Sequence, residues 1–307
     1  MITLFHDDID VLRGKKVSIA LGVFDGVHAG HRKLLDQLNA CASEDGSAKV
    51  VYTFVNHPEA VLFGNAPKYI DSFEEKAEKF ESIGVDYLWA ATFTKEMAEM
   101  QPESFIQRLI QPFKVACLIA GYDYTFGDRA LGHARDLEEY GRKYGFSTRI
   151  VPAVMDNGLP VSSSRIRESI KAGDVEDAGR LLRSAYRIQG TIESGRRIGT
   201  QMGFPTANIR YAPGKVLPAN GVYITVLRLN GQRMPSVTNV GRNPTIGSAN
   251  AVTIETHILD FDGDIYGQDA SVEFIRRLRP EMRFPDRESL TMQIQRDIAQ
   301  ANAYFGE

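Results

Sequence analysis

One stretch decides the fold of the first half of the chain: Val17-Ser18-Ile19-Ala20-Leu21-Gly22-Val23-Phe24-Asp25-Gly26-Val27-His28-Ala29-Gly30-His31. It opens as a mostly apolar run, which is typical of a strand buried on both faces. Small residues then make a turn, and helical periodicity begins directly after it. A strand that is followed directly by a helix is typical of a parallel sheet, because each helix brings the chain back to the end of the sheet where the next strand begins.

The rest of the first half repeats this alternation. Strands are predicted at 17–23, 49–54, 85–91, 115–120 and 147–154, and helices at 31–42, 72–83, 102–110 and 135–144. The pattern predicts the α/β class, with a doubly wound, Rossmann-like parallel sheet that has helices on both faces. Ligands of such sheets bind at the carboxyl ends of the strands, where the turn at 22–31 falls.

The second half has another character. Short strand-like runs occur at 186–193, 221–229, 234–240, 252–261 and 270–275, and a final helical stretch at 286–303. Turn residues such as Asn230-Gly231 and Gly241-Arg242-Asn243-Pro244 separate the runs. This predicts an antiparallel β-barrel closed by a terminal helix. We therefore expect two domains, 1–185 and 186–307, with a hinge between Arg180 and Arg187.

Composition narrows the class of protein. The net charge of -3 gives no basic field for a nucleic-acid partner, and no apolar run approaches the ~20 residues that span a bilayer. The N-terminal stretch lacks the apolar core of a secretory signal, so a cytoplasmic location is expected. Cys41 and Cys117 lie among apolar residues and are expected to be buried thiols, not a disulfide or metal site. The sequence leaves a homo-oligomer open.

The first candidate site is the pair His28 and His31 around Gly30. Free backbone N–H groups and the helix dipole at this point favour an anion, and two imidazoles there can stabilise charge on a phosphate. The pattern HxGH after a strand is typical of nucleotidylyltransferases that act at an α-phosphate. A pair of histidines that merely caps the helix is the alternative.

A second phosphate cradle is predicted where Ser162-Ser163-Ser164 opens another helix that also carries Arg167. The alternative is an ordinary serine N-cap with solvated arginines.

With these motifs, Thr53-Phe54-Val55-Asn56-His57-Pro58 and Gly121-Tyr122-Asp123-Tyr124-Thr125-Phe126-Gly127 make residues 1–185 resemble the FMN adenylyltransferase module of bacterial bifunctional riboflavin kinase/FAD synthetases. The resemblance implies flavin contacts by Phe54 and Phe126, for which core packing is the alternative. It implies ATP contacts by Gly22, Phe24, Asp25, His28, His31, Asp123, Ser164 and Arg167. Asn56, Ser164, Tyr124 and the linker Leu182–Tyr186 depart from the family pattern.

The second candidate site has no Walker loop. Instead, glycines repeat every four residues at Gly195, Gly199 and Gly203, around two arginines, in a loop suited to a polyphosphate. Thr206 and Asn208 alternate onto one face of the next segment, as two oxygen ligands of Mg²⁺ would. A surface hairpin loop is the alternative.

The strings Gly203-Phe204-Pro205-Thr206-Ala207-Asn208 and Ile254-Glu255-Thr256-His257 make residues 186–307 resemble the riboflavin kinases. The resemblance implies that Glu255 is the general base toward the riboflavin 5′-hydroxyl. It implies that Mg²⁺–ATP is bound by Gly195, Gly199, Gly203, Pro205, Thr206 and Asn208. His257 is expected to support Glu255 or the loop, and Arg279 to be a flavin-side or structural residue.

The sequence thus predicts a bifunctional enzyme that uses ATP and Mg²⁺ to convert riboflavin to FMN and FMN to FAD. One rival is a monofunctional protein with one decayed site, although both motif sets keep their essential residue types. A second rival is another HxGH enzyme with an unrelated barrel, and the strings PTAN and ETH count against it. The third is a flavin-binding regulator or RNA-binding module, which the acidic balance disfavours.

Overall fold

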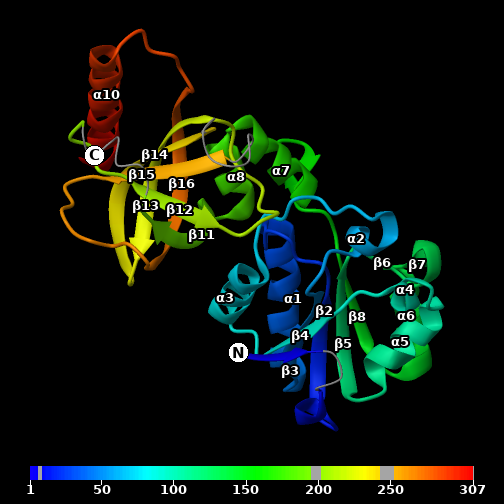
Figure 1. Cartoon of the computed structure of the whole chain (residues 1–307). Helices are drawn as coiled ribbons and strands as arrows, with labels where there is room; N and C mark the ends of the chain where they lie inside the picture. Colours follow the sequence, from blue (N-terminus) through cyan, green and yellow to red (C-terminus); the bar gives the residue numbers. More distant parts are fainter. Residues whose placement is uncertain (6–8, 195–201, 243–251, 307) are drawn as a thin grey trace. The chain divides into compact units, whose positions relative to one another are not determined.

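The computed structural model describes residues 1–5, 9–194, 202–242 and 252–306. Internal contacts divide the chain into two compact units, Met1–Ser163 and Ser164–Glu307. Figure 1 shows the first as a sheet with helices and the second as a barrel with helices. The predicted boundary at 185/186 stays a prediction. The predicted glycines Gly195 and Gly199 lie outside the described residues.

The first unit is built on a six-stranded parallel sheet in the order β1-β4-β3-β2-β5-β8. Its strands are β1 (Ile2–Phe5), β2 (Lys16–Leu21), β3 (Ala48–Phe54), β4 (Tyr87–Ala91), β5 (Lys114–Gly121) and β8 (Ser147–Val151). The strand β2 pairs with β3 on one side and with β5 on the other, so the winding reverses there. That reversal is the switch point at which doubly wound sheets bind ligands.

Helices cover both faces of this sheet, which confirms the predicted doubly wound architecture. The helical elements are η1 (Asp10–Leu12), α1 (Ala29–Asp45), α2 (Pro58–Phe63), α3 (Phe73–Ile83), α4 (Lys95–Ala98), α5 (Pro102–Ile110), η2 (Asp128–Ala130) and α6 (Asp136–Tyr144). Leu35 of α1 and Phe80 of α3 pack on one face, and Phe105 of α5 and Leu137 of α6 on the other. Two small hairpins complete the unit: β6 (Thr125–Phe126) with β7 (Gly132–His133), and β9 (Met155–Asp156) with β10 (Leu159–Pro160).

The edge strand β1 was not predicted from the sequence. Its side chains are mostly exposed, with Ile2 at 50% and Phe5 at 48%, and Leu4 alone is buried. Four residues with one buried side chain give no periodic signal, so the strand depends on its pairing with β4.

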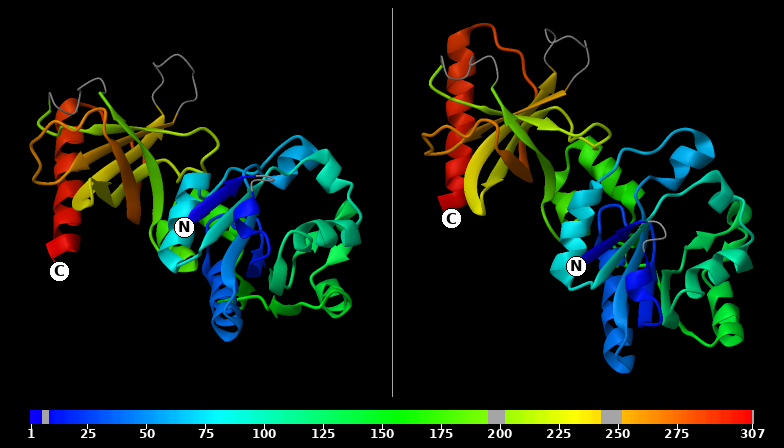
Figure 2. Two further views of the ribbon diagram at one scale, coloured as in Figure 1. Left: turned by 90° about the horizontal axis from the view of Figure 1, so that it is seen from below. Right: turned by 60° about the horizontal axis from the view of Figure 1, so that its bottom comes forward.

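The second unit is a closed antiparallel barrel in the order β11-β12-β15-β14-β13-β16, as predicted. Its elements are β11 (Tyr186–Glu193), β12 (Ala207–Tyr211), β13 (Gly221–Leu229), β14 (Gln232–Arg242), β15 (Val252–Ile258), β16 (Asp269–Pro280) and α10 (Arg287–Gly306). The terminal helix α10 runs along the outside of the barrel in all views (Figures 1 and 2). Inside the barrel, the buried hydroxyls of Thr225, Ser236, Thr238 and Thr256 bond to one another in a chain, so their polar atoms are satisfied.

Two more helices belong with the barrel strands: α7 (Ser163–Ala172), apart from its first residue, and α8 (Val175–Leu182). The side chains of Leu181 and Leu182 in α8 are buried, and α8 packs against β16 and β11. Arg277 of β16 donates a hydrogen bond of 3.2 Å to the carbonyl oxygen of Ala172. Within the described residues, no helix has the length and apolar character needed to cross a bilayer.

Candidate active sites

The turn after β2 lies at the switch point and has an unusual backbone. Phe24 and Val27 have positive φ angles of 57° and 40°, and both side chains are fully buried. Positive φ is uncommon outside glycine and costs of order 1–3 kcal/mol per residue. Surrounding contacts must therefore hold this turn in place.

Asp25 supplies two of those contacts. Its Oδ1 accepts hydrogen bonds from the backbone N–H groups of Ile70 and Asp71, at 2.9 and 3.1 Å. Ser163, at the start of α7, donates from its hydroxyl to the carbonyl oxygen of Asp25 at 2.8 Å. The serine string and the histidine turn thus meet in the structure. These bonds give Asp25 a structural role, and its contact with ATP stays a prediction.

His28 and His31 stand at the start of α1 with stacked rings, 3.7 Å apart between centroids and 16° between planes. His28 is the N-cap: its Nδ1 accepts a long bond of 3.4 Å from the N–H of His31. A side chain at Gly30 would come within 3.1 Å of the His28 ring and would displace that ring by a few tenths of an ångström, so glycine favours this arrangement. His28 thus caps the helix, and this role does not exclude the predicted binding of phosphate by the two histidines.

His31 differs from His28 in its bonding. Its Nδ1 is buried and has no hydrogen-bond partner. Burial lowers the pKa of His31 well below 6.5, and electrostatic interactions with His28, Lys76 and Lys79 lower it further. The free site thus presents a neutral imidazole beside two ammonium groups, at a helix N-terminus that favours an anion.

Those two lysines, both from α3, were missed in the sequence. Lys76 is buried, and its ammonium donates to the carbonyl oxygens of Val23 at 3.3 Å and Phe54 at 3.5 Å. Lys79 binds both carboxylate oxygens of Asp71, at 2.8 and 2.6 Å. A signal existed: Lys76 falls on the apolar stripe formed by 73, 77 and 80, where a solvated lysine is not expected.

The predicted flavin contacts lie mostly in the core. Phe54 and Phe126 are 8% and 6% exposed. Phe54 packs edge-on against Phe93 at 5.2 Å between ring centroids, and Phe126 lies 5.6 Å from Phe105. Core packing, the alternative weighed for both residues, accounts for these positions, and a flavin contact stays a prediction.

Three other predicted ATP contacts are spread over both units. Asp123 follows β5, on the other side of the switch point from Gly22, and is exposed. Ser164 and Arg167 lie on α7 in the second unit, where Ser164 is exposed and Arg167 is 8% exposed. All three assignments remain predictions.

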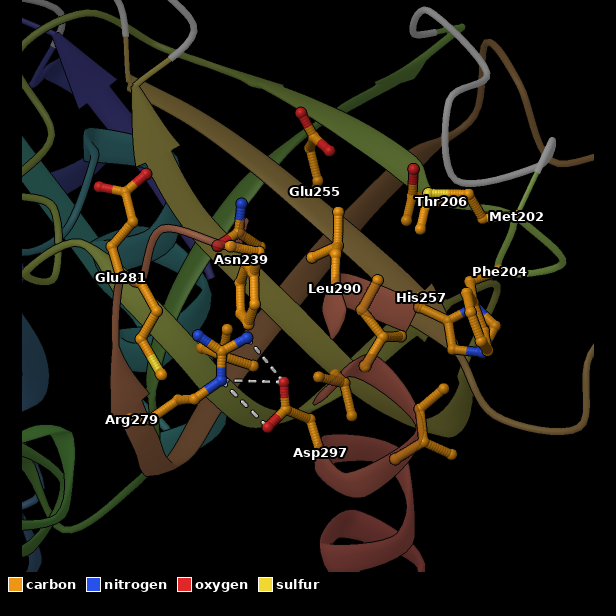
Figure 3. Close-up of a pocket in the computed structure, with 16 residues that line it drawn as sticks. Met202, Phe204, Thr206, Asn239, Glu255, His257, Arg279, Glu281, Leu290 and Asp297 are labelled. Carbon is orange, nitrogen blue, oxygen red and sulfur yellow. Dashed lines mark hydrogen bonds and ion pairs between the residues drawn. The ribbon is translucent and has the colours of Figure 1, made fainter. Parts of the chain in front are cut away.

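The barrel holds a pocket of about 390 Å³ between its outer face and α10. Strand register places Asn208, Glu255, Asn239, Val222 and Arg279 in one row across β12, β15, β14, β13 and β16. The last four of these line the pocket, as does Thr206. Figure 3 shows Glu255, Asn239 and Arg279 around it, with Leu290 of α10 among the apolar side chains. Polar side chains from three of these strands, those of Glu255, Asn239 and Arg279, thus face apolar side chains across the pocket.

Glu255 has the environment of a base. Burial raises the pKa of its carboxyl, and a hydrogen bond with Thr253 partly opposes that rise. Its strand neighbours Ile254 and Thr256 point into the barrel and are fully buried, which leaves Glu255 on the pocket face.

The predicted Mg²⁺ segment lies beside this carboxylate. Ala207 is buried and its neighbours Thr206 and Asn208 are half-buried, so these two side chains share the other face. His257 approaches the segment: its Nδ1 lies 2.8 Å from the carbonyl oxygen of Pro205. A carbonyl only accepts, so this Nδ1 carries the proton. His257 therefore supports the loop through this nitrogen, and its support of Glu255 stays a prediction.

Arg279 forms a buried ion pair that the sequence did not predict. Its Nε and Nη2 bind the carboxylate of Asp297 in α10 at 2.8–3.1 Å (Figure 3). Asp297 is 2% exposed and also accepts a bond from Gln293. This pair fixes α10 against β16 at the pocket wall, which gives Arg279 a structural contact, and its flavin-side role stays a prediction because it also lines the pocket. Pairing between distant elements leaves no sequence signal.

Metal binding by the protein alone is not supported. The described residues contain no group of three or more His, Cys, Asp and Glu side chains that would hold a metal. Thr206 and Asn208 would supply two oxygen ligands, and Mg²⁺ in kinase sites usually takes its remaining ligands from substrate phosphates and water. The residues therefore fit a Mg²⁺ ion that arrives with ATP.

Fold and sites together define a two-domain transferase: an HxGH-type α/β nucleotidyltransferase joined to a flavokinase-type barrel. The FAD synthetase family matches residues 12–165, and the riboflavin kinase family matches residues 182–305. The chain belongs to the bifunctional riboflavin kinase/FMN adenylyltransferase family. The predicted fold class and the predicted bifunctional enzyme are confirmed at this level.

Individual relatives cover nearly the whole chain. The bifunctional riboflavin kinase/FMN adenylyltransferase of Listeria monocytogenes is 36% identical over 94% of this chain and 92% of its own length. That of Bacillus subtilis is 34% identical over 99% and 97%. A Streptococcus pneumoniae crystal structure described as a macrolide-efflux protein superposes with a TM-score of 0.90, at 30% identity over 98% and 99% of the two chains. Macrolide efflux is what the description says of that protein, and the similarity to this chain is one of fold.

Proposed function

We propose that the barrel pocket transfers the γ-phosphoryl group of ATP to the 5′-hydroxyl of riboflavin, and that Glu255 accepts the hydroxyl proton. The riboflavin oxygen forms a bond to the γ-phosphorus, the bond to the β-phosphate oxygen breaks, and ADP leaves. A carboxylate with a raised pKa is a better proton acceptor at neutral pH than an exposed one. The observation that carries the proposal is the row of Asn208, Glu255 and Asn239 across three adjacent strands at the pocket.

Binding of Mg²⁺–ATP by Thr206 and Asn208 is part of the same proposal. Their side chains share a face beside Glu255, within a segment that the His257 bond to Pro205 holds. A bound Mg²⁺ would neutralise charge on the β- and γ-phosphates. The apolar wall of the pocket, which includes Leu290 of α10, suits the isoalloxazine ring of riboflavin.

For the first unit we propose adenylylation of FMN at the switch point. A phosphate oxygen of FMN bonds to the α-phosphorus of ATP, the bond to the β-phosphate oxygen breaks, and pyrophosphate leaves. The amino end of α1 and the rings of His28 and His31 would stabilise charge that develops on the phosphate. A cytoplasmic location, where ATP is abundant, belongs to the proposal.

One experiment tests both halves. Pure protein is incubated with Mg²⁺–ATP and either riboflavin or FMN, and the flavins and ADP or pyrophosphate are separated and quantified. We expect FMN and ADP first from riboflavin, and FAD with pyrophosphate from FMN. Absence of FAD with FMN supplied would refute the first-unit proposal, and absence of FMN from riboflavin would refute the barrel proposal.

A further inference from the structure

The carbonyl groups of the turn after β2 are bonded by side chains from distant elements. Lys76 of α3 and Thr53 of β3 donate to the carbonyl oxygen of Val23, the latter at 3.0 Å. Lys79 donates to that of Gly26 at 3.4 Å. Among these donors, Lys76 also reaches the carbonyl oxygen of Phe54 at the end of β3. One ammonium therefore joins the carboxyl ends of two neighbouring strands.

A buried lysine at this position is costly. The ammonium of Lys76 is removed from water, and lysine is rarely buried without compensation. The hydrogen-bond distances of 3.3 and 3.5 Å are long, and the nearby carboxylates of Asp25, Asp71 and Glu74 offset only part of the effect of burial, because the pKa of Lys76 is still lowered. An apolar side chain would suit the stripe of α3 at lower cost. A charge at this cost, placed where it joins the ends of two strands, points to a role in the site and not to stability.

We propose that Lys76 is a positioning residue of the nucleotidyl-transfer site, which holds the ends of β2 and β3 and thereby fixes the strained turn that carries His28 and His31. This inference rests on the proposed adenylylation of FMN by the first unit. The positive φ angles of Phe24 and Val27 require such external fixation.

The charge of Lys76 has a second consequence at His31. The groups that face this imidazole are His28 on its own turn and Lys76 and Lys79 from α3, and all three disfavour its protonated form. The carboxylates of Asp25, Asp71 and Glu74 act on Lys76 itself. Removal of the Lys76 charge should therefore raise the protonation midpoint of His31, which reports that the ammonium lies close to this imidazole.

The test compares Lys76→Met, Lys76→Gln and Lys76→Arg with the matched control Lys114→Met, which removes an exposed lysine at the opposite end of the sheet. Three quantities are measured in the full chain. They are FAD formation from FMN, FMN formation from riboflavin as the internal control, and the His31 midpoint by NMR of ¹⁵N-histidine protein, assigned with His31→Ala.

We expect Lys76→Met to lower FAD formation by about tenfold to a hundredfold, the size of one hydrogen bond to a charged group, and to raise the His31 midpoint. Lys76→Gln keeps a donor, so it should lose less rate and still raise the midpoint. Lys76→Arg should restore the midpoint. FMN formation and the Lys114→Met variant should match the wild type.

If Lys76→Met fails to fold, the Gln and Arg variants decide. The proposal would be overturned if Lys76→Met and Lys76→Gln both showed the wild-type rate of FAD formation and the wild-type His31 midpoint. If Lys76→Met is unfolded, the same result in Lys76→Gln alone would overturn it. A wild-type protein that makes no FAD would instead refute the proposed function. The midpoint of His31 is independent of activity and would still test Lys76.

Discussion

The sharpest test of the barrel site is Glu255→Gln, which keeps the size of the side chain and removes the base. Base catalysis of this kind contributes about 10²–10⁴-fold in rate, so FMN formation should fall by that factor. FAD formation from supplied FMN should survive, because a phosphate nucleophile needs no deprotonation at neutral pH. The two activities of one preparation thus serve as a control for each other.

The same substitution has an unusual expected effect on stability. Burial raises the Glu255 pKa above 4.5, so the folded chain keeps this proton to a higher pH than the unfolded chain does. The contribution of Glu255 to the free energy of unfolding therefore falls as pH rises through that window. At neutral pH the ionised carboxylate costs stability. Glu255→Gln removes the cost and should unfold at the same temperature as the wild type or a higher one.

Glu273→Gln is the matched control. Glu273 is another barrel glutamate, in β16, and it is paired with Arg228 at 2.5 Å and Arg233 at 3.3 Å. Its carboxylate is buried, so the substitution should lower the free energy of unfolding by about 1.5–3 kcal/mol and leave both activities unchanged. Glu255→Gln should therefore lower the rate of FMN formation without lowering the melting temperature. Glu273→Gln should lower the melting temperature without lowering that rate.

The pH dependence completes this test. With a base whose pKa lies above the ordinary value, FMN formation by the wild type should fall toward acid pH, and this acid limb should lie above pH 4.5. The residual activity of Glu255→Gln should lack that limb. A folded Glu255→Gln protein that makes FMN at a near-normal rate, or that loses FAD formation from FMN, would refute the assignment.

Three further predictions concern the other parts of the chain. His31→Ala should lower FAD formation by about 10²–10³ and let FMN accumulate from riboflavin; equal loss of both activities would contradict two separate sites. Asp297→Ala leaves the Arg279 guanidinium without its partner and should cost about 3 kcal/mol or more in thermal or denaturant unfolding, whereas an unchanged midpoint would show that the pair does not fix α10. The fragment 164–307 should make FMN alone and melt at a higher temperature than 186–307, because α8 packs on β16 and β11 and Arg277 bonds to the last residue of α7; equal melting temperatures would favour the boundary at 185/186.

The elements whose own sequence shows a clear hydrophobic period were predicted most accurately. The strands at 186–193 and 221–229 and the helix at 102–110 were predicted with the bounds that the structure has. The elements that depend on pairing with another strand were not predicted. The strand β12 alternates over only five residues directly after a Gly and Pro segment, and β1 has one buried side chain, so neither was predicted as a strand.

Local sequence also determined the chemistry that each site can perform. The pair of histidines around Gly30 needs only a strand, a turn and a helix, and the alternation of Thr206 with Asn208 needs only an extended chain. Residue type and spacing fix such features, because all the atoms involved lie within a few residues of one another.

Tertiary structure alone decided which distant groups support those residues. Lys76 reaches Val23 and Phe54 from 53 and 22 residues away, and Arg279 finds Asp297 on another element. Register across β12, β15 and β14 brings Asn208 and Asn239 to the two sides of Glu255. Such contacts depend on how whole helices and strands pack and pair, and a short stretch of sequence does not determine that packing.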